Sequence, residues 1–345
     1  MSQRANTPGL YTKTRARLSL ALDTDHGPCH TIPMDDHPHR LHLWLVTDGK
    51  AGHRSQLQGL SDAFCRQTDS TATWVDAQAA GYGWGHWMLH RSPALPKAPL
   101  PQLLVAAGRR THPLLLGLKR RLRVPAVVIM RPSFPLHWVD GAVIPEHDQP
   151  PRRDTVLPVK GALNPMVAQN KPATPGTGMI LLGGPSRHYH WDEVALQQAL
   201  HTLTQEYPDW HWTLATSRRT PESLVQALAH HPALHLRRHD QVPPGWLREE
   251  LPRQQVLWAT PDSVSMVSEA LSTGRPTGVL PLTPRRQSRV VACMTALRSH
   301  GYLYDWSERQ QMMTATQNPP LQESDRAASW LRQRFFPEHF REGSP

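Results

Sequence analysis

Short apolar runs, each ended by polar turn residues, recur along the chain from residue 41 onward. Such runs suit parallel strands that are buried on both faces. Apolar residues at helical spacing follow several of them, as Leu57, Leu60 and Phe64 do behind the first run. The pattern predicts strands within 41–48, 101–108, 124–132, 138–148, 178–186, 210–217, 254–260 and 276–282. It predicts helices within 54–67, 109–122, 191–207, 220–231 and 261–274.

A linker rich in proline, glycine and threonine within 170–178 interrupts this alternation, which then restarts. The pattern therefore predicts an α/β fold with two Rossmann-like domains that face each other across a cleft. A length of 345 residues fits two domains. Residues 1–40 lack periodicity and have the composition of a disordered basic arm. The expected organisation is this arm, a first domain at 41–170, a second at 178–315, and a C-terminal helix or tail at 316–345.

Charge narrows the choice of partners. The chain has 38 Lys+Arg against 28 Asp+Glu, a net charge of +10, which favours a phosphate-bearing ligand, an anionic membrane surface or nucleic acid. Nucleic acid is not expected, because the basic residues are scattered without interleaved aromatic residues. The alternative is that the excess positive charge does not serve to bind an anionic partner. The basic cluster offered to a membrane is Lys119, Arg120, Arg121 and Arg123.

Cysteine content and hydropathy indicate the compartment. The three cysteines form no CxxC pair, so neither a disulfide framework nor a zinc ribbon is indicated and a reducing cytosol fits. No apolar run approaches the ~18 residues of a membrane span, and no secretory signal is visible. We therefore expect a cytoplasmic protein whose membrane contact, on the inner face, is peripheral and electrostatic.

The segment "TDGKAGH", residues 47–53, joins the first strand to the first helix. Gly49 and Gly52 allow a sharp turn and a close backbone approach to a ligand, with the free N–H groups of the helix facing it. Lys50 adds a positive charge, and His53 adds an imidazole, a group that commonly titrates near neutral pH. A Walker A loop and the GxGxxG fingerprint are both absent. The segment predicts contact with a polar or anionic group, and the alternative is a plain tight turn.

Three strand ends in the second half are also polar. They bear Gly183, Gly184 and Ser186; Arg218 and Arg219; and Asp262, Ser263, Ser265, Ser268 and Glu269. The last group surrounds a helix start whose N–H donors and outward-facing hydroxyls suit a pyrophosphate. Glu269, two turns further on, could accept hydrogen bonds from a ribose. The alternative for each group is a helix cap or a solvated face.

The motifs TDGKAGH, AAGRRTHP, PEHD, KGALN, GGPSRHYHW, TSRRTP and DSVSMVSEA, in this order, resemble the mitochondrial fission protein family of the ELM (elongated mitochondria) type. The resemblance runs from about residue 41 to residue 305 and leaves out the arm and the tail. Through the bacterial branch of the family it implies a glycosyltransferase. Through the plant members, which recruit a dynamin-like fission protein, it implies a non-catalytic scaffold instead.

The family is similar, more distantly, to GT-B glycosyltransferases of the MurG type. That similarity implies an acceptor-facing loop at Gly49, Gly52 and His53, a donor turn at Gly183, Gly184 and Ser186, and a donor-ribose contact at Glu269. The loop here lacks the extra glycines of the MurG type, so the diphospholipid acceptor of those enzymes does not carry over directly.

Residues and resemblance together predict a metal-independent GT-B glycosyltransferase that takes a nucleotide-diphosphate sugar as substrate and needs no further cofactor. Its acceptor would be a lipid-linked or cell-envelope glycan. Helix dipoles and arginines would offset the charge of the leaving group, at the turn 183–186, Arg218 or Arg219, Ser263 and Ser265. The alternatives are a scaffold, or a nucleotide-sugar epimerase of the GT-B type; the oligomeric state is left open.

A base in the first domain would deprotonate the acceptor hydroxyl. His53 and Asp48 are the first candidates for this base. The group Glu146, His147 and Asp148 follows them. A metal site is the alternative for that group, although three consecutive residues do not easily face one ion, and no metal is expected.

Overall fold

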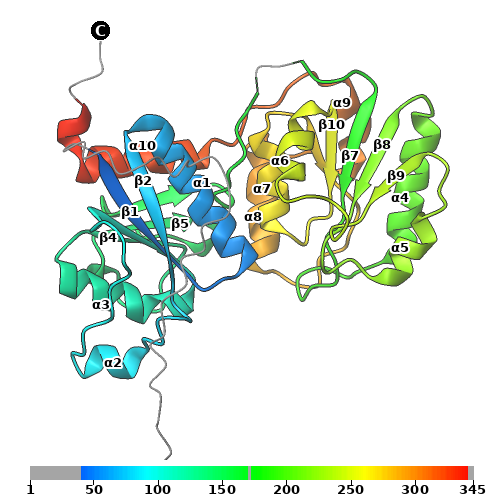
Figure 1. Cartoon of the computed structure of the whole chain (residues 1–345). Helices are drawn as coiled ribbons and strands as arrows, with labels where there is room; N and C mark the ends of the chain where they lie inside the picture. Colours follow the sequence, from blue (N-terminus) through cyan, green and yellow to red (C-terminus); the bar gives the residue numbers. More distant parts are fainter. Residues whose placement is uncertain (1–39, 170–171, 341–345) are drawn as a thin grey trace, which may run out of the picture.

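The structure, a computed structural model, describes residues 40–169 and 172–340. Two lobes lie side by side, and each is a parallel sheet covered by helices (Figure 1). The predicted α/β fold with two Rossmann-like domains is confirmed. The N-terminal arm expected over residues 1–40 lies, except for Arg40, outside the described residues.

Six parallel strands form the first sheet, in the order β2-β1-β3-β4-β5-β6. They are β1 (Leu41–Thr47), β2 (Ser70–Asp76), β3 (Leu103–Ala107), β4 (Ala126–Ile129), β5 (Gly141–Pro145) and β6 (Val156–Val159). The strands β1, β3, β4 and β5 are buried along their whole length, as expected for apolar runs between two helical layers. The edge strands β2 and β6 were not predicted.

Helices cover both faces of this sheet. They are α1 (Ala51–Gln67), α2 (Trp84–Met88) and α3 (His112–Leu122). Because successive side chains of a strand point to opposite faces, Leu43 of β1 packs in the cluster that contains Leu57 and Phe64 of α1. Its neighbour Trp44 packs instead in the cluster that contains Leu115 of α3.

Five parallel strands form the second sheet, in the order β11-β10-β7-β8-β9. They are β7 (Thr177–Leu181), β8 (His211–Ala215), β9 (Leu234–Arg237), β10 (Val256–Ala259) and β11 (Thr277–Val279). The helices of this half are α4 (Glu193–Glu206), α5 (Glu222–Leu228), α6 (Trp246–Glu250), α7 (Val264–Ser272), α8 (Arg289–Ser299) and α9 (Arg309–Thr314). The strand β9 and the helices α6, α8 and α9 were not predicted.

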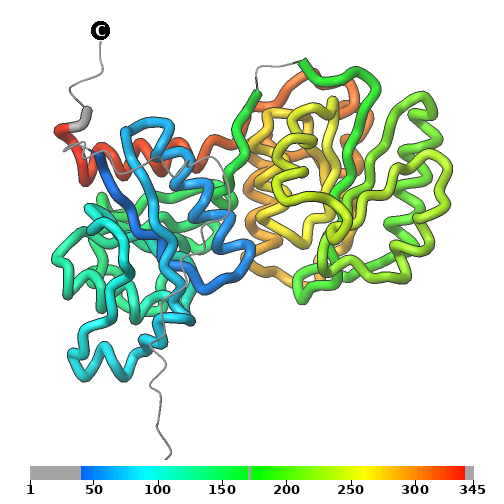
Figure 2. Tube along the Cα trace, in the orientation of Figure 1, coloured from blue at the N-terminus to red at the C-terminus, as the bar shows by residue number. Residues whose placement is uncertain are grey.

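The chain passes between the lobes twice (Figure 2). It leaves the first lobe after β6 and returns after α9 to form α10 (Glu323–Phe335) beside α1. Ala327, Ala328 and Leu331 of α10 complete the apolar cluster under α1. The C-terminal helix expected within 316–345 therefore packs on the first sheet, far from the strand that precedes it in the sequence.

A buried polar segment, residues 161–164, joins the domains and is called the domain junction below. The backbone N–H of Ala162 donates to Oγ of Ser268 at 3.0 Å, and Nδ2 of Asn164 donates to Oγ of Ser272 at 3.0 Å. The backbone of Asn164 also exchanges hydrogen bonds with the hydroxyl of Ser324, in the first turn of α10. One segment thus bonds to α7 in the second domain and to the returning C-terminal helix.

We predict that Asn164→Ala lowers the free energy of unfolding by about 2–3 kcal/mol, because buried groups that lose their partners cost about 1–3 kcal/mol. Urea unfolding followed by circular dichroism measures this loss. The exposed Ser299→Ala is the control and should change stability by less than about 0.5 kcal/mol. Adding Ser272→Ala to Asn164→Ala should cost less than the sum of the two single changes. Equal effects of Asn164→Ala and Ser299→Ala would contradict a role of the junction in stability.

Candidate active site

Each sheet reverses its strand order at one point, and ligands of open α/β sheets bind at the carboxyl ends of the strands beside it. The reversal lies between β1 and β3 in the first sheet and between β7 and β10 in the second. The segments at these strand ends are 48–50, 108–110, 183–186 and 261–263. Most of the motifs selected in the sequence therefore lie where the topology predicts a ligand.

Asp48 and His53 form a hydrogen-bonded pair at the end of β1. A turn of three residues, 48–50, leads directly into α1, so His53 lies in the first turn of the helix and not in a loop before it. Its Nδ1 lies 2.7 Å from Oδ1 of Asp48, whose side chain is 1% exposed. With the Nδ1 proton shared with the carboxylate, Nε2 is the nitrogen that can take a proton from a ligand. Lys50 Nζ lies 4.0 Å from the other oxygen of Asp48.

Gly108, at the end of β3, has no side chain, and this makes room for the pair. A Cβ at this position would lie 2.4 Å from Nδ1 of His53 and 2.8 Å from Oδ2 of Asp48, and φ is +98°. Any other residue would collide with the pair and would also adopt a disfavoured left-handed backbone. Gly49, in the turn itself, also has a left-handed backbone, with φ +78°, which favours glycine.

A cavity of about 430 Å³, the His53 cavity, lies in front of the pair. It is lined by Asp48, Lys50, His53, Gly108, Arg109, Arg110, His112, Ile129, Met130, Arg131, Asp148 and Arg289. Only Arg289, at the start of α8, comes from the second domain. The cavity is therefore a feature of the first domain with a strongly basic wall.

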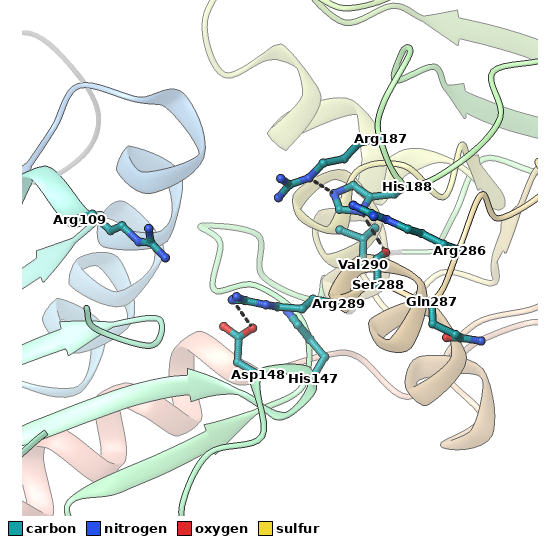
Figure 3. A pocket seen from close by; sticks show the side chains of 10 residues that line it. All are labelled: Arg109, His147, Asp148, Arg187, His188, Arg286, Gln287, Ser288, Arg289 and Val290. Carbon is teal, nitrogen blue, oxygen red and sulfur yellow. Dashed lines mark hydrogen bonds and ion pairs between the residues drawn. The ribbon is translucent and has the colours of Figure 1, made fainter. Parts of the chain in front are cut away.

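A cavity of about 760 Å³, the arginine cavity, lies between the domains (Figure 3). It is lined by Arg109, His147, Asp148, Arg187, His188, Arg286, Gln287, Ser288, Arg289 and Val290. Figure 3 shows Arg109 pointing in from the first domain, opposite Arg187 and Arg286 of the second. Because Arg109, Asp148 and Arg289 line both cavities, the two cavities adjoin.

Two loops of the second domain pair with each other and so bring their arginines together. The N–H of Arg285 donates to the carbonyl of His188 at 2.9 Å, and the N–H of His190 donates to the carbonyl of Thr283 at 2.9 Å. Nδ1 of His188 also lies 2.9 Å from Oγ of Ser288, the N-cap of α8. The segments before and after these contacts hold Arg187 and Arg286 on one side of the cavity.

Burial and neighbouring arginines keep two of the imidazoles neutral. Burial, together with the charge of Arg109, lowers the pKa of His112 to about 4. Burial, together with the charges of Arg187 and Arg286, also lowers the pKa of His188. Near pH 7 these two rings add no charge, so the arginines set the electrostatic character of this part of the cleft.

Gly183 and Gly184 contact a buried carboxylate. Asp262 is fully buried, accepts a hydrogen bond from the N–H of Gly184 at 3.2 Å, and pairs with Arg219 at 2.7 Å. A Cβ on Gly183 would lie 2.3 Å from Oδ1 of Asp262, which repeats the close approach of Gly108 to Asp48. The charge of Arg219 is thus offset within the chain.

Ser186 and Ser263 lie at the ends of β7 and β10. The hydroxyl of Ser186 accepts from the N–H groups of His188 and Tyr189, while Ser263 is the N-cap residue of α7 and forms no side-chain cap bond. Arg218 is exposed. The predicted donor residues all belong to the described part of the chain, yet none of them lines either cavity. They are Gly183, Gly184, Ser186, Arg218, Arg219, Ser263, Ser265 and Glu269.

The hydroxyl-bearing face of α7 is turned toward the first domain. Oγ of Ser265 lies 3.8 Å from the place of a Cβ on Gly52, and Oγ of Ser55 donates to Oε1 of Glu269 at 3.2 Å. Ser268 is fully buried against the domain junction. The expectation that these hydroxyls face outward is therefore wrong for Ser268. Burial also raises the pKa of Glu269 to about 7, against the opposing hydrogen bond from Ser55.

Glu146, His147 and Asp148 form a short 3₁₀ helix (η3) after β5, packed against α8. Asp148 pairs with Arg289 at 3.0 Å across the domains, and burial lowers the pKa of His147. Asp148 lines both cavities and His147 one of them. No three histidine, cysteine or carboxylate side chains within 40–169 and 172–340 are grouped to hold a metal ion.

Sequence reasoning missed several residues of the cleft. They are Arg109, Arg110, Arg131, Arg187, His188, Arg286, Ser288 and Arg289. Signals existed for some of them, since Arg187 follows the selected Ser186 directly. Ser288 precedes apolar residues at helical spacing, Val291, Met294 and Leu297, which is the pattern of a capped helix.

Residues 51–335 match the sequence profile of the family described as "Mitochondrial fission ELM1". The chain belongs to the mitochondrial fission ELM1 family. The match extends past residue 305, where the resemblance of motifs was expected to end, and so includes α10. An uncharacterized protein of Rickettsia prowazekii (strain Madrid E) is 20% identical over 297 residues, covering 68% of this chain and 82% of that protein.

Solved structures similar to this ELM1-family chain include two sugar-nucleotide epimerases. A UDP-N-acetylglucosamine 2-epimerase matches with a TM-score of 0.53 and 13% identity, covering 89% of this chain and 98% of its own. The UDP-GlcNAc 2-epimerase from Neisseria meningitidis, bound to UDP-GlcNAc, matches with a TM-score of 0.50 and 11% identity, covering 85% and 99%. At such identities the likeness shows the fold alone, which is the two-domain GT-B fold.

Gly108→Ala should displace the pair of Asp48 and His53, because the added Cβ meets both side chains. We expect a loss of about 1–3 kcal/mol in the free energy of unfolding. We also expect changed ring-nitrogen shifts of His53 in long-range ¹H–¹⁵N spectra. Gly85→Ala is the matched control, because nothing lies within 4 Å of a Cβ there. Unchanged stability and ring shifts in Gly108→Ala would refute this account of the pair.

Glu269→Gln should remove a pH dependence of stability. The pKa of Glu269 is raised from about 4.5 to about 7, so the native state keeps a proton that the unfolded chain releases between these values. Stability from this group is complete below about pH 4.5 and is lost as the pH rises to about 7. The melting temperature of the variant relative to the parent should therefore rise from pH 5 to pH 8. Glu249→Gln, at an exposed carboxyl, is the control for the loss of one charge, and a constant difference for Glu269→Gln would contradict the raised pKa.

Proposed function

We propose that this chain transfers a glycosyl group from a nucleotide-diphosphate sugar to an acceptor hydroxyl. The observation that supports it most is the pairing of His53 with a buried carboxylate in a cavity that adjoins a second, arginine-lined cavity. A histidine held by a carboxylate suits proton abstraction from a hydroxyl, and a group of arginines suits a diphosphate leaving group. The GT-B fold agrees with such a reaction but does not by itself identify it.

In the proposed reaction Nε2 of His53 takes the proton of the acceptor hydroxyl. The acceptor oxygen forms a bond to the anomeric carbon of the donor, while the bond from that carbon to the diphosphate oxygen breaks and its electron pair leaves with the diphosphate. Asp48 would stabilise the imidazolium that forms, and its buried carboxylate fixes the orientation of the ring. His53 is thus the proposed base, and Asp48 positions it.

Arg187, Arg286 and Arg289 would offset the charge that develops on the diphosphate. All three line the arginine cavity, and their guanidinium groups suit phosphate oxygens. The proposed chemistry uses these cations of the chain and no metal or further cofactor. This moves the proposed phosphate contacts from Arg218 and Arg219 to Arg187 and Arg286, in the two paired loops of the second domain, and to Arg289 at the start of α8.

The nucleoside would lie over the carboxyl ends of β7 and β10, near Gly183, Gly184 and Ser263. Glu269 remains the proposed acceptor for the ribose hydroxyls. Its hydrogen bond with Ser55 lies between α1 and α7, so a ribose there would compete with a contact between the domains.

A peripheral contact with an anionic membrane remains part of the proposal. Within the described residues, no helix combines the length and the apolar character of a membrane span. Of the basic cluster at the end of α3, Lys119 pairs with Asp140 at 2.9 Å, and Arg120 and Arg121 donate to backbone carbonyls of the segment around α2. These carbonyls do not offset the charges of Arg120 and Arg121. The exposed Met88 and Leu89 lie at the end of α2.

His53→Gln tests the reaction. Donor binding, measured by calorimetry with a panel of UDP-, ADP- and GDP-sugars, should stay within about twofold of the parent, because the proposed donor cations are intact. Turnover, measured as release of nucleoside diphosphate with acceptor present, should fall roughly 10²–10⁴-fold. His300→Gln, at an exposed histidine, is the control and should change neither quantity.

Other outcomes distinguish the rival functions. If no nucleotide sugar binds or raises the melting temperature, the transferase is excluded and a scaffold is favoured. If the donor sugar changes configuration with no transfer to an acceptor, the chain is an epimerase. If His53→Gln turns over as fast as the parent, another group is the base.

A further inference from the structure

The arginines of the cleft are grouped around two adjoining cavities, and most of them lack a carboxylate partner. Elsewhere in the described chain some arginines are paired, as Arg66, Arg238 and Arg309 are, each within 3 Å of a carboxylate oxygen. Others, such as Arg120, donate only to uncharged oxygens. Five arginines of the cleft have no carboxylate within ion-pair distance among residues 40–169 and 172–340. They are Arg109, Arg110, Arg131, Arg187 and Arg286. Exposed cations that remain unpaired around a cavity are suited to an anionic ligand.

The excess charge is larger than a diphosphate requires. Lys50 and six arginines line the two cavities, against two carboxylates, Asp48 and Asp148. Five positive charges therefore remain, counting only lysine, arginine and carboxylates. The diphosphate of a nucleotide sugar brings about two negative charges at neutral pH. Roughly three cations are left without a counter-charge when the donor alone is bound.

The two sets of cations are also separate in space. Arg187 and Arg286 line only the arginine cavity. Lys50, Arg110 and Arg131 line only the His53 cavity. The uncompensated charge is therefore on the side where the acceptor must meet His53.

Arg131 is held in its place by the backbone. Met130, which precedes it at the end of β4, has φ +72°, a left-handed conformation that costs a non-glycine residue roughly 1–2 kcal/mol. The guanidinium donates to the carbonyl of Asp148 at 2.9 Å, and this bond offsets none of its charge. The chain thus adopts a disfavoured conformation at a residue that leads an unpaired cation to the wall of the cavity.

We propose that the acceptor carries a phosphate group of its own, and that Lys50, Arg110 and Arg131 bind it in the His53 cavity. The identification of this ligand as the acceptor rests on the proposed function, whereas the binding of a phosphate group in this cavity does not. The phosphate would lie close enough to the reacting hydroxyl for both to occupy a space of about 430 Å³. Specificity for the acceptor then comes from these cations, and specificity for the donor comes from the arginine cavity.

The test uses two matched pairs of substitutions in the full chain. Arg110→Gln with Arg131→Gln removes charge from the His53 cavity, and Arg187→Gln with Arg286→Gln removes it from the arginine cavity. The probes, titrated by calorimetry, are glycerol 1-phosphate, a short-chain phosphatidic acid below its micellar concentration, and UDP or ADP. Circular dichroism verifies folding. The single change Arg110→Gln serves if the pair is unstable, because the exposed side chain of Arg110 makes no hydrogen bond in the described chain.

We expect the first pair to weaken binding of glycerol 1-phosphate roughly tenfold or more, and binding of the nucleotide by no more than about twofold. The second pair should show the reverse. Tighter binding of phosphatidic acid than of glycerol 1-phosphate would assign the phosphate to a lipid, and equal binding to a soluble ester; both support the proposal. It is overturned if only the second pair weakens glycerol 1-phosphate binding, or if this probe does not bind.

The same measurements distinguish failure of the phosphate site from failure of the proposed transferase function. One outcome is that the chain binds no nucleotide, while changing Arg110 and Arg131 still abolishes binding of glycerol 1-phosphate. This outcome would exclude the transferase but support the phosphate site. Nucleotide binding with no phosphate site would keep the transferase and make its acceptor neutral.

Discussion

The cleft depends on the hydrogen bonds of the domain junction, residues 161–164. Backbone groups of Ala162 and Asn164 pair with Ser268 of α7 and with Ser324 of α10, all of them buried. Each such bond contributes only about 1 kcal/mol net, but a buried group that loses its partner costs more. The junction therefore has few low-energy alternatives, and it fixes how the carboxyl edges of the two sheets face each other. His53 on one edge and Arg187 on the other approach a common space only because of that arrangement.

A second constraint repeats in both domains. At each reversal of strand order a buried aspartate lies where the neighbouring strand ends in glycine: Asp48 beside Gly108, and Asp262 beside Gly183. In each, one carboxylate oxygen is buried without a hydrogen-bond partner in the described chain. A buried carboxylate needs a partner. In the second domain that partner is Arg219, a permanent cation, so the pair can only position the loop. In the first it is His53, which can exchange a proton, so only this pair suits chemistry.

The fold could be predicted from sequence wherever burial is uniform. The central strands β1, β3, β7 and β10 are continuous apolar runs, and these were found. The strands that were missed, β2, β6 and β9, all lie at sheet edges. Ser70–Asp76 mixes buried with half-buried positions, and Val156–Val159 contains a proline that an edge tolerates. A criterion based on apolar runs detects burial on both faces, and these three edge strands lack it.

The site was predictable only as far as it is local in sequence. Asp48, Gly49, Lys50 and His53 follow one strand, so the turn and the helix start that unite them are visible in seven residues. The pairing of the loop at His188 with the loop at Arg285 joins segments almost a hundred residues apart, and no spacing in the sequence indicates it. The hydroxyls of α7 show that a local polar pattern can also mislead. A polar helix face at a strand end suits a ligand, but it suits a second domain equally well, and Ser268 and Ser272 are satisfied by the junction. What distinguishes the two cases is whether a polar side chain already has a partner within the chain. By that criterion the unpaired arginines of the cleft, rather than the serines, are the groups that are free to bind a ligand.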